Sequence, residues 1–414
     1  MTSVPMSQIV SEAITALAPT FTQVDLHVKQ NLARVLQAFR DQRVGAHHFA
    51  SVSGYGHGDM GREVIDQVFA QVMGADSAAV RLQFVSGTHA IACCLFGILR
   101  PLDELVSVAG APYDTLEEVI GYPLTSDSQG HRYAGSLKDF GITYRQVELT
   151  ETGGINWEAL ATAIKPQTRM VLIQRSCGYA WRESLSIADI AKIIQIVKQQ
   201  NPDTVCFVDN CYGEFISDRE PTAVGADIMA GSLIKNPGGT IATAGGYVAG
   251  KAEYVELAAQ RLTAPGIGRD GGATFDLNRL ILQGLFLAPQ MVGEAIKSSH
   301  LAAYVFDKLG YAVKPKPFET RQDIIQAIQL GDPQKLIEFC RNLQRYSPID
   351  SYVDPVPGEM PGYVSQLVMA GGTFIDGSTL ELSADGPLRE PYTVFLQGGT
   401  HWTHLAIALE NFQI

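Results

Sequence analysis

A lysine in an unusual sequence context is the strongest chemical signal in this chain. Lys235 lies in the segment Gly231-Ser-Leu-Ile-Lys-Asn-Pro-Gly-Gly239, an apolar turn that is rich in Gly, Ser and Pro. A lysine deprived of water loses basicity and becomes usable as an amine nucleophile. A surface turn with a solvated lysine is the alternative, so this interpretation needs support from other segments.

An aspartate closes a second apolar segment. Asp209 follows the run Val205-Cys-Phe-Val208, which is typical of a buried strand. A carboxylate at such a position must be paired or hydrogen-bonded, because an isolated buried charge is very costly. A protonated ring nitrogen is a suitable partner, whereas the capping of a turn by Asp209 is the competing interpretation.

Two further segments could hold a phosphate and cover a flat ring. Val85-Ser-Gly-Thr-His-Ala90 leads from a predicted strand into an apolar helix. The free backbone N–H groups and the dipole at such a helix start bind phosphate, although an ordinary Ser/Thr cap has the same sequence. Tyr113 lies just beyond the strand-like residues 105–109 and could cover a ring or pack within its own domain.

Alternating strands and helices must position these residues. Short apolar, β-branched runs predict strands at residues 79–85, 105–108, 142–149, 170–173, 205–208 and 246–249. Helical periodicity predicts helices between them, most clearly at residues 63–73, 157–164 and 187–199. This alternation is typical of an α/β protein with a parallel or mostly parallel sheet that is covered on both faces. Ligands of such sheets bind beyond the carboxyl ends of the strands.

The flanking sequence predicts further parts. Residues 7–17 and 24–39 have helical periodicity, and residues 45–61 form a loop or arm. A long helical region, residues 275–309, could be broken near Pro289, and helices at 321–330, 333–346 and 401–411 alternate with strands at 364–374, 378–382 and 393–396. We therefore expect an N-terminal helical arm and loop (1–60), a large α/β domain (61–295) and a small C-terminal α+β domain (296–414).

The four segments would bring a phosphate-binding turn, an aromatic ring, an acid and a lysine to one sheet edge. Pyridoxal 5′-phosphate requires such a set: an anion site, a ring cover, an acid opposite its pyridine nitrogen and a lysine that binds it covalently. The order of the segments is more specific than any one of them.

The sequence resembles the fold-type-I pyridoxal-phosphate enzymes, in particular the cystathionine/methionine γ-lyase-like group often labelled aluminium-resistance proteins. The resemblance covers nearly the whole chain and is best marked at residues 54–62, 86–90, 112–118, 209–214, 231–239 and 389–392. It implies a mostly parallel seven-stranded sheet and a smaller C-terminal α+β domain. It also implies a lyase that cleaves a C–S bond of a sulfur-containing amino acid.

The resemblance assigns roles to residues of the predicted sheet edge. Lys235 would bind the cofactor covalently, Asp209 would pair with its pyridinium nitrogen, and Tyr113 would stack on the ring and assist proton transfer. The predicted phosphate ligands are Ser86, Gly87, Thr88 and Ser232. Cys211 falls where lyases place a small residue under the ring, and Tyr212 falls where aminotransferases place a tyrosine near the phenolic oxygen.

The resemblance also implies an assembly. Tyr55 and Arg62 match a Tyr and an Arg that reach the phosphate from a neighbouring subunit, although their spacing departs from the usual Tyr-x-Arg. A homodimer or homotetramer with active sites at the interface is therefore expected. Arg389 is the candidate ligand of the substrate carboxylate. The lysine is followed by Asn236, where the best-known lyases have an aromatic residue, and this departure leaves the substrate and the choice of β- or γ-elimination open.

Composition excludes several other classes of function. The net charge is −12 and no Lys/Arg-rich run exists, so nucleic-acid binding is not expected. No stretch of about 18 uncharged apolar residues and no signal peptide is visible, and the six cysteines lack metal-ligand spacing. We expect a soluble cytoplasmic protein with reduced thiols, no metal site and a small amino acid as its partner.

Three alternatives remain open at this point. The first is another pyridoxal-phosphate reaction, such as transamination, aldol cleavage or racemisation, because the initial steps are shared. The second is a dinucleotide-binding dehydrogenase, since residues 56–61 match GxGxxG, although the preceding residues form a poor strand. The third is a non-catalytic protein linked to metal tolerance.

Overall fold

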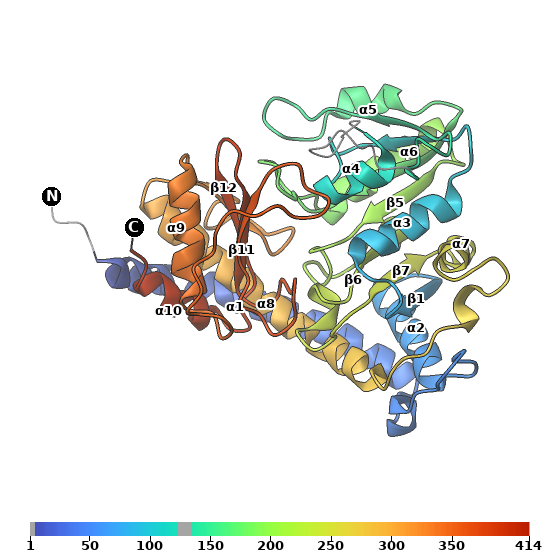
Figure 1. Ribbon diagram of the computed structural model, residues 1–414, viewed down its shortest axis with the longest axis horizontal. Coiled ribbons are helices and arrows are strands. Elements are labelled where there is room, and N and C mark those ends of the chain that lie inside the picture. Colours follow the sequence, from blue (N-terminus) through green and yellow to red (C-terminus); the bar gives the residue numbers. More distant parts are fainter. Residues whose placement is uncertain (1–4, 123–134, 414) are drawn as a thin grey trace.

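Two β-sheets joined by two long helices organise the protein (Figure 1). The structure is a computed structural model that describes residues 5–122 and 135–413. Residues 1–4 lie outside the described residues. They are part of the N-terminal segment whose sequence predicts that there is no signal peptide. The larger sheet has seven strands and the smaller has five in the part of the chain that is described.

The larger sheet is mostly parallel, as expected. Its strand order is β1-β7-β6-β5-β4-β2-β3, and β7 runs antiparallel to both of its neighbours while the remaining pairs are parallel. The strands are β1 (Ser77–Arg81), β2 (Glu104–Ser107), β3 (Thr143–Gln146), β4 (Thr168–Gln174), β5 (Val205–Asp209), β6 (Ile228–Ser232) and β7 (Gly246–Gly250).

Helices bury both faces of this sheet. One face packs on α3 (Gly87–Ile98), α4 (Asp114–Ile120) and α7 (Ala252–Leu262). The other face packs on α1 (Met6–Asp41), α2 (Met60–Met73), α5 (Trp157–Ala163), α6 (Ile187–Gln200) and α8 (Asn278–Lys308). The central strands are therefore apolar on both sides, which explains why they are continuous hydrophobic runs in the sequence.

The smaller sheet is wholly antiparallel, with the strand order β10-β11-β12-β9-β8. Its strands and covering helices are β8 (Ala312–Lys314), β9 (Gln326–Gln329), β10 (Leu367–Ala370), β11 (Ser383–Pro387), β12 (Thr393–Gln397), α9 (Pro333–Gln344) and α10 (Trp402–Glu410). A separate apolar core joins this sheet to the first half of α1 and the last third of α8. This confirms the expected α+β arrangement of the C-terminal part.

The two long helices correct two expectations. Residues 7–17 and 24–39 belong to one helix, α1, which continues through Pro19, and α8 continues through Pro289. A proline inside a helix removes one hydrogen bond, but buried apolar residues on both sides of each proline hold the helix together. α1 and α8 pack along each other and pass from one sheet to the other (Figure 1). The predicted domain boundary near residue 296 lies inside α8, and the division into domains stays a prediction.

Three local expectations differ from the structure. β6 was not expected, because Ala-Gly-Ser at its end lacks β-branched side chains, yet the strand is buried between β5 and β7. The helix predicted at 321–330 is wrong, since β9 occupies its second half and pairs with β8 and β12. The strand predicted at 378–382 is also wrong, because this segment is irregular and β11 begins at Ser383.

Short elements complete the described chain. The 3₁₀ helices are η1 (Ala46–Phe49), η2 (Pro221–Val224), η3 (Asn236–Gly238) and η4 (Gly268–Asp270). All six cysteines are free and buried. No helix among the described residues is long and apolar enough to span a membrane.

A close backbone approach between α8 and η3 holds the turn that carries Lys235. A Cβ added at Gly284 of α8 would lie 2.3 Å from the carbonyl oxygen of Gly238. Gly284→Ala should therefore lower the free energy of unfolding by about 1–3 kcal/mol, because the helix must move away from the turn. Thermal or urea unfolding measures the effect. Gln290→Ala, on an exposed position of the same helix, should change stability by less than about 0.5 kcal/mol, and equal effects of the two variants would contradict the prediction.

Candidate active site

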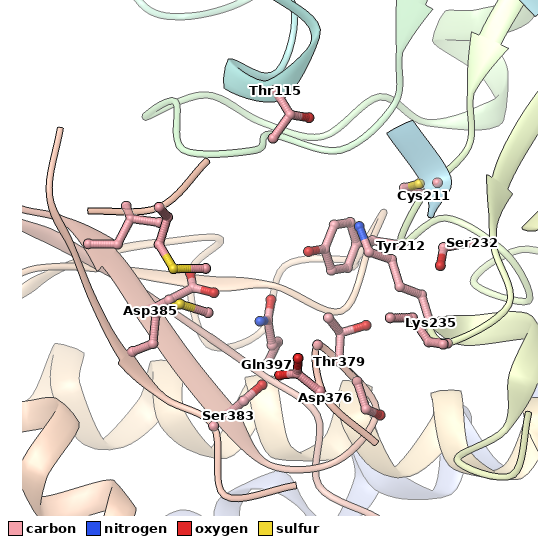
Figure 2. Close-up of a pocket in the computed structure, with 18 of the residues that line it drawn as sticks. Thr115, Cys211, Tyr212, Ser232, Lys235, Asp376, Thr379, Ser383, Asp385 and Gln397 are labelled. Carbon is pink, nitrogen blue, oxygen red and sulfur yellow. The ribbon is translucent and has the colours of Figure 1, made fainter. Parts of the chain in front are cut away.

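A cavity of about 480 Å³ lies between the two sheets. Its walls come from the carboxyl ends of β5 and β6, the start of α3 and strands of the smaller sheet (Figure 2). A volume of this size suits a small organic ligand together with a substrate. The cavity contains most of the residues to which the sequence assigned chemistry.

Strand geometry explains why Asp209 and Ser232 face the same side of the larger sheet. Side chains alternate along a strand, and Phe207 of β5 and Ala230 of β6 both pack on the α3 side. Asp209 and Ser232 lie two residues further on, so both point to the face that α3 covers. Each is also the last residue of its strand, where parallel strands leave ligand space.

The start of α3 approaches these strand ends closely. A Cβ added at Gly87 would lie 3.2 Å from the Cβ of Ser232 and 3.3 Å from the Sγ of Cys211. A side chain at this position would thus be tight, and Ser232 or Cys211 would have to move by a few tenths of an ångström. The first N–H groups of the helix have no intrahelical acceptors, so they are available to an anion in front of them.

The side chain of Ser86 caps α3, and this contact does not decide whether the start of α3 also binds a phosphate group. Ser86 Oγ accepts a hydrogen bond of 3.1 Å from the backbone N–H of His89, which is the ordinary capping interaction. Thr88 Oγ1 lies 2.9 Å from Thr115 Oγ1 at the start of α4. The side chains of Ser86 and Thr88 are thus used within the protein, while Gly87 and Thr88 themselves line the cavity at the start of α3.

Ser232 carries a buried hydroxyl that has no partner among the described residues. Its side chain is 2% exposed, and its Oγ neither donates nor accepts a hydrogen bond. A buried hydroxyl without a partner is unfavourable in the protein alone. Together with the glycine at the start of α3, it fits a bound phosphate group, so the residues present are compatible with pyridoxal 5′-phosphate.

Asp209 is buried at the base of the cavity, with 6% of its surface exposed. Its Oδ1 accepts a hydrogen bond of 3.1 Å from the backbone N–H of Cys211. Burial raises the pKa of Asp209, although the charge of Lys235 and the hydrogen bond from Cys211 act in the opposite direction. A cationic partner, such as a protonated ring nitrogen, would compensate the lost solvation of this carboxylate.

Lys235 follows β6 and points into the cavity toward Tyr212 (Figure 2). Its Nζ lies 4.1 Å from the centroid of the Tyr212 ring, a cation–π distance. Burial alone lowers the pKa of Lys235, but Cys211, Tyr212 and Asp209 raise it above the usual range. In the protein alone, these partners therefore act against the loss of basicity that burial of Lys235 favours.

Tyr113 belongs to a group of three tyrosines that line the cavity. Its hydroxyl lies 2.7 Å from the hydroxyl of Tyr363, and its ring centroid lies 5.7 Å from that of Tyr179. Burial raises the pKa of Tyr113 and of Tyr179 well above the ordinary value. Tyr113 is therefore neutral and can donate a proton. Tyr363 precedes β10, so this hydrogen bond connects the two sheets across the cavity.

Three residues assigned from the resemblance lie elsewhere in the described chain. Tyr55 is 83% exposed, and Arg62 is buried and donates to the carbonyl oxygens of Gly56 and Gly272. Neither lines the cavity. Arg389 pairs with Asp114 at 3.4 Å and lines a smaller neighbouring cavity that shares Tyr113 with the first. The roles of these three residues stay predictions.

Residues of the smaller sheet line the far side of the cavity and were not found from the sequence. The clearest are Asp385 of β11 and Gln397 of β12, with Tyr179 between the sheets. Asp385 is flanked by Ala and Gly, so its sequence resembles an ordinary turn. Only the pairing of β11 with β12 brings it opposite Lys235, and no local signal reveals that pairing.

The family model for methionine gamma-lyase matches residues 6–413. The chain belongs to this family. YnbB of Bacillus subtilis is 46% identical over 393 residues, which cover 95% of this chain and 92% of YnbB. The structure of a carbon-sulfur lyase involved in aluminium resistance from Clostridium novyi NT is 46% identical, with a TM-score of 0.91 and coverage of 98% of this chain and 94% of that one.

A more distant likeness concerns the fold alone. CalE6, a methionine gamma lyase from Micromonospora echinospora, matches with a TM-score of 0.59 and 20% identity over 88% of this chain and 92% of its own. These findings confirm the expected family, the fold-type-I architecture and an enzyme of the carbon–sulfur lyase type. The family implies pyridoxal phosphate as cofactor. The dehydrogenase alternative is excluded, because residues 56–61 follow coil and no strand precedes them in residues 5–55.

The environment of Asp385 predicts a pH-dependent stability. Burial raises the pKa of Asp385 from 3.8 to about 6, so the folded protein binds more protons than the unfolded chain between these values. Stability from this group is therefore lost as the pH rises from about 4 to 6. Asp385→Asn should be more stable than the wild type above pH 7, by on the order of 1–2 kcal/mol, with the difference vanishing near pH 4. Unfolding of both proteins across this range tests the effect, which a difference independent of pH would contradict.

Proposed function

We propose that the protein is a pyridoxal-phosphate-dependent lyase that cleaves the C–S bond of a sulfur-containing amino acid. The products of an α,β- or α,γ-elimination are a thiol, ammonia and a 2-oxo acid. The observation that carries the proposal is the meeting of Lys235, Asp209 and the unpartnered hydroxyl of Ser232 at one sheet edge in a chain of this family.

The residues proposed to hold the cofactor come from three elements. The backbone of Gly87 and Thr88 and the hydroxyl of Ser232 would bind its phosphate. The Ser86 hydroxyl, which accepts from the N–H of His89, would donate its own proton to the same group. Asp209 would keep the ring nitrogen protonated, and Lys235 would bind the cofactor covalently. Tyr113 would cover the ring from above. Cys211 and Tyr212, which line the same cavity, would contact it from below and beside the phenolic oxygen.

Proton transfer is the part of the reaction that these residues perform. The bound cofactor supplies an electron sink for the carbanion that forms at Cα. The amine of Lys235, once free and neutral, takes the Cα proton, because it points into the cavity where the substrate must lie. The neutral hydroxyl of Tyr113, held by Tyr363, can donate a proton to the leaving sulfur.

The proposed assembly is a homodimer or homotetramer whose active sites lie at the interface. Tyr55 is exposed, and Arg62 holds the loop around it through the carbonyl oxygens of Gly56 and Gly272. An exposed tyrosine on a tethered loop suits a contact with a second subunit, where it would reach the phosphate. Arg389 remains the proposed ligand of the substrate carboxylate, which would then compete with Asp114 for the guanidinium group.

Lys235→Ala tests the proposed function directly. The wild type with pyridoxal 5′-phosphate should show a yellow absorption band that borohydride bleaches, and peptide mapping should find the reduced cofactor on Lys235. The variant should lose this covalent link and at least a thousandfold of the elimination rate, because both the anchor and the base are gone. A colourless wild type that stays unlabelled, or a variant with full activity, would overturn the proposal.

Ser232→Ala should separate stability from cofactor binding. Removal of the unpartnered hydroxyl should stabilise the protein without cofactor by about 1 kcal/mol, and should weaken its affinity for pyridoxal 5′-phosphate about five- to tenfold. Ser107→Ala is the matched control, since Ser107 also ends a strand but donates to the carbonyl oxygen of Gly110 at 2.6 Å. That variant should lose stability. Thermal unfolding and cofactor titration measure both effects, and destabilisation by Ser232→Ala would refute the assignment.

A further inference from the structure

The smaller sheet presents a second group of polar side chains to the cavity. Ser383 of β11 is 6% exposed and Thr379 is 4% exposed, and the hydroxyl oxygens of both have no hydrogen-bond partner among the described residues. Figure 2 shows both side chains on the side of the cavity that faces Lys235. Buried hydroxyls without partners are costly, so this wall is suited to a polar ligand group that the protein itself does not supply.

Asp385 lies on the same wall. It follows Ser383 by two residues, so both side chains leave β11 on the same face. Within β11 it is the least buried residue, because its carboxylate opens into the cavity. Tyr179 and Gln397 line the cavity with Asp385 and act to lower the pKa of its carboxylate, whose two oxygens can accept further hydrogen bonds.

The charges that line the cavity are unbalanced. Four aspartates face it, namely Asp209, Asp350, Asp376 and Asp385, and Lys235 is the only cation among the described lining residues. Under the proposed function, Lys235 is committed to the cofactor and Asp209 to the ring nitrogen. No cationic side chain among the described lining residues then remains to pair with Asp385, although the wall formed by β11 and β12 encloses it.

We propose that Asp385, with Ser383 and Gln397, binds a protonated amine carried by the part of the substrate that leaves with the sulfur. This inference rests on the proposed function and names its substrate class. The α-amino group cannot be the ligand, since it must reach the position of Lys235 on the opposite wall (Figure 2). The class is an amino-acid thioether whose departing thiol ends in an ammonium group, in contrast to the neutral methylthio group of methionine.

A matched pair of substrates tests this subsite. S-(2-aminoethyl)-L-cysteine and S-propyl-L-cysteine have nearly the same shape, and only the first carries a terminal ammonium group. The corresponding homocysteine pair serves for γ-elimination. With the wild type and its cofactor, kcat/KM should be at least tenfold higher for the aminoethyl compound, because a charge-assisted hydrogen bond forms in an enclosed site. Asp385→Asn should bring this ratio close to one through the loss of the aminoethyl rate.

Two variants control for indirect effects. Asp376→Asn removes an exposed acid of the same cavity and should leave the preference within about twofold of the wild type. Ser383→Ala keeps the charge of Asp385 and should reduce the preference about twofold to fivefold. It thus provides a second measurement should Asp385→Asn fail to fold. A wild-type ratio near one, or a ratio that Asp385→Asn leaves unchanged, would overturn the subsite.

A binding measurement with compounds that cannot be cleaved tests the subsite independently of the proposed reaction. L-Lysine and L-2-aminoheptanoic acid match the cysteine pair with CH₂ in place of sulfur, so no C–S bond can break. Calorimetry with the holoprotein should find lysine bound at least tenfold more tightly, and Asp385→Asn should abolish the difference. If this preference holds while no thioether is cleaved, the subsite stands and the lyase proposal fails. If thioethers are cleaved and neither pair shows a preference, the lyase stands and the subsite is wrong.

Discussion

The close approach of α3 to the carboxyl ends of β5 and β6 is the constraint on which the site depends. Gly87 favours this approach, because a Cβ there would lie only 3.2 Å from Ser232 and 3.3 Å from Cys211. The approach also places the free N–H groups of a helix start beside the last residues of two strands, one an acid and one a hydroxyl. Lys235 follows within one turn of the same strand end, so the cofactor side of the cavity is assembled by one helix–sheet contact.

The two long helices determine how the second wall of the cavity meets the first. α1 and α8 run from the core of the larger sheet into the core of the smaller one, and their packing sets the position of β11 and β12 (Figure 1). The hydrogen bond between Tyr113 and Tyr363 joins the segment before α4 to the segment before β10, and both tyrosines line the cavity. A movement of either helix would therefore change the cavity as a whole.

Several polar groups around the cavity are unfavourable in the protein alone. Ser232, Thr379 and Ser383 have buried hydroxyls that find no partner among residues 5–122 and 135–413, and burial raises the pKa of Asp209 and Asp385. A protein selected only for stability would replace such groups with apolar ones. These groups lie on two facing walls of the cavity. Their cost is the physical reason to interpret the wall with Ser232 and Asp209 as a cofactor site and the wall with Thr379, Ser383 and Asp385 as a substrate site.

The sequence alone determined the alternation of strands and helices, and with it the sheet edge at which Lys235, Asp209 and Ser232 meet. These inferences succeeded because buried parallel strands and helix starts leave local signals in composition and periodicity. Only the tertiary structure decided that β6 is a strand, that residues 326–329 belong to a sheet and that α8 continues through Pro289, since packing outweighs local propensity there. Asp385 joined the site for the same reason: strand pairing across many residues places it opposite Lys235, and no short segment encodes that pairing.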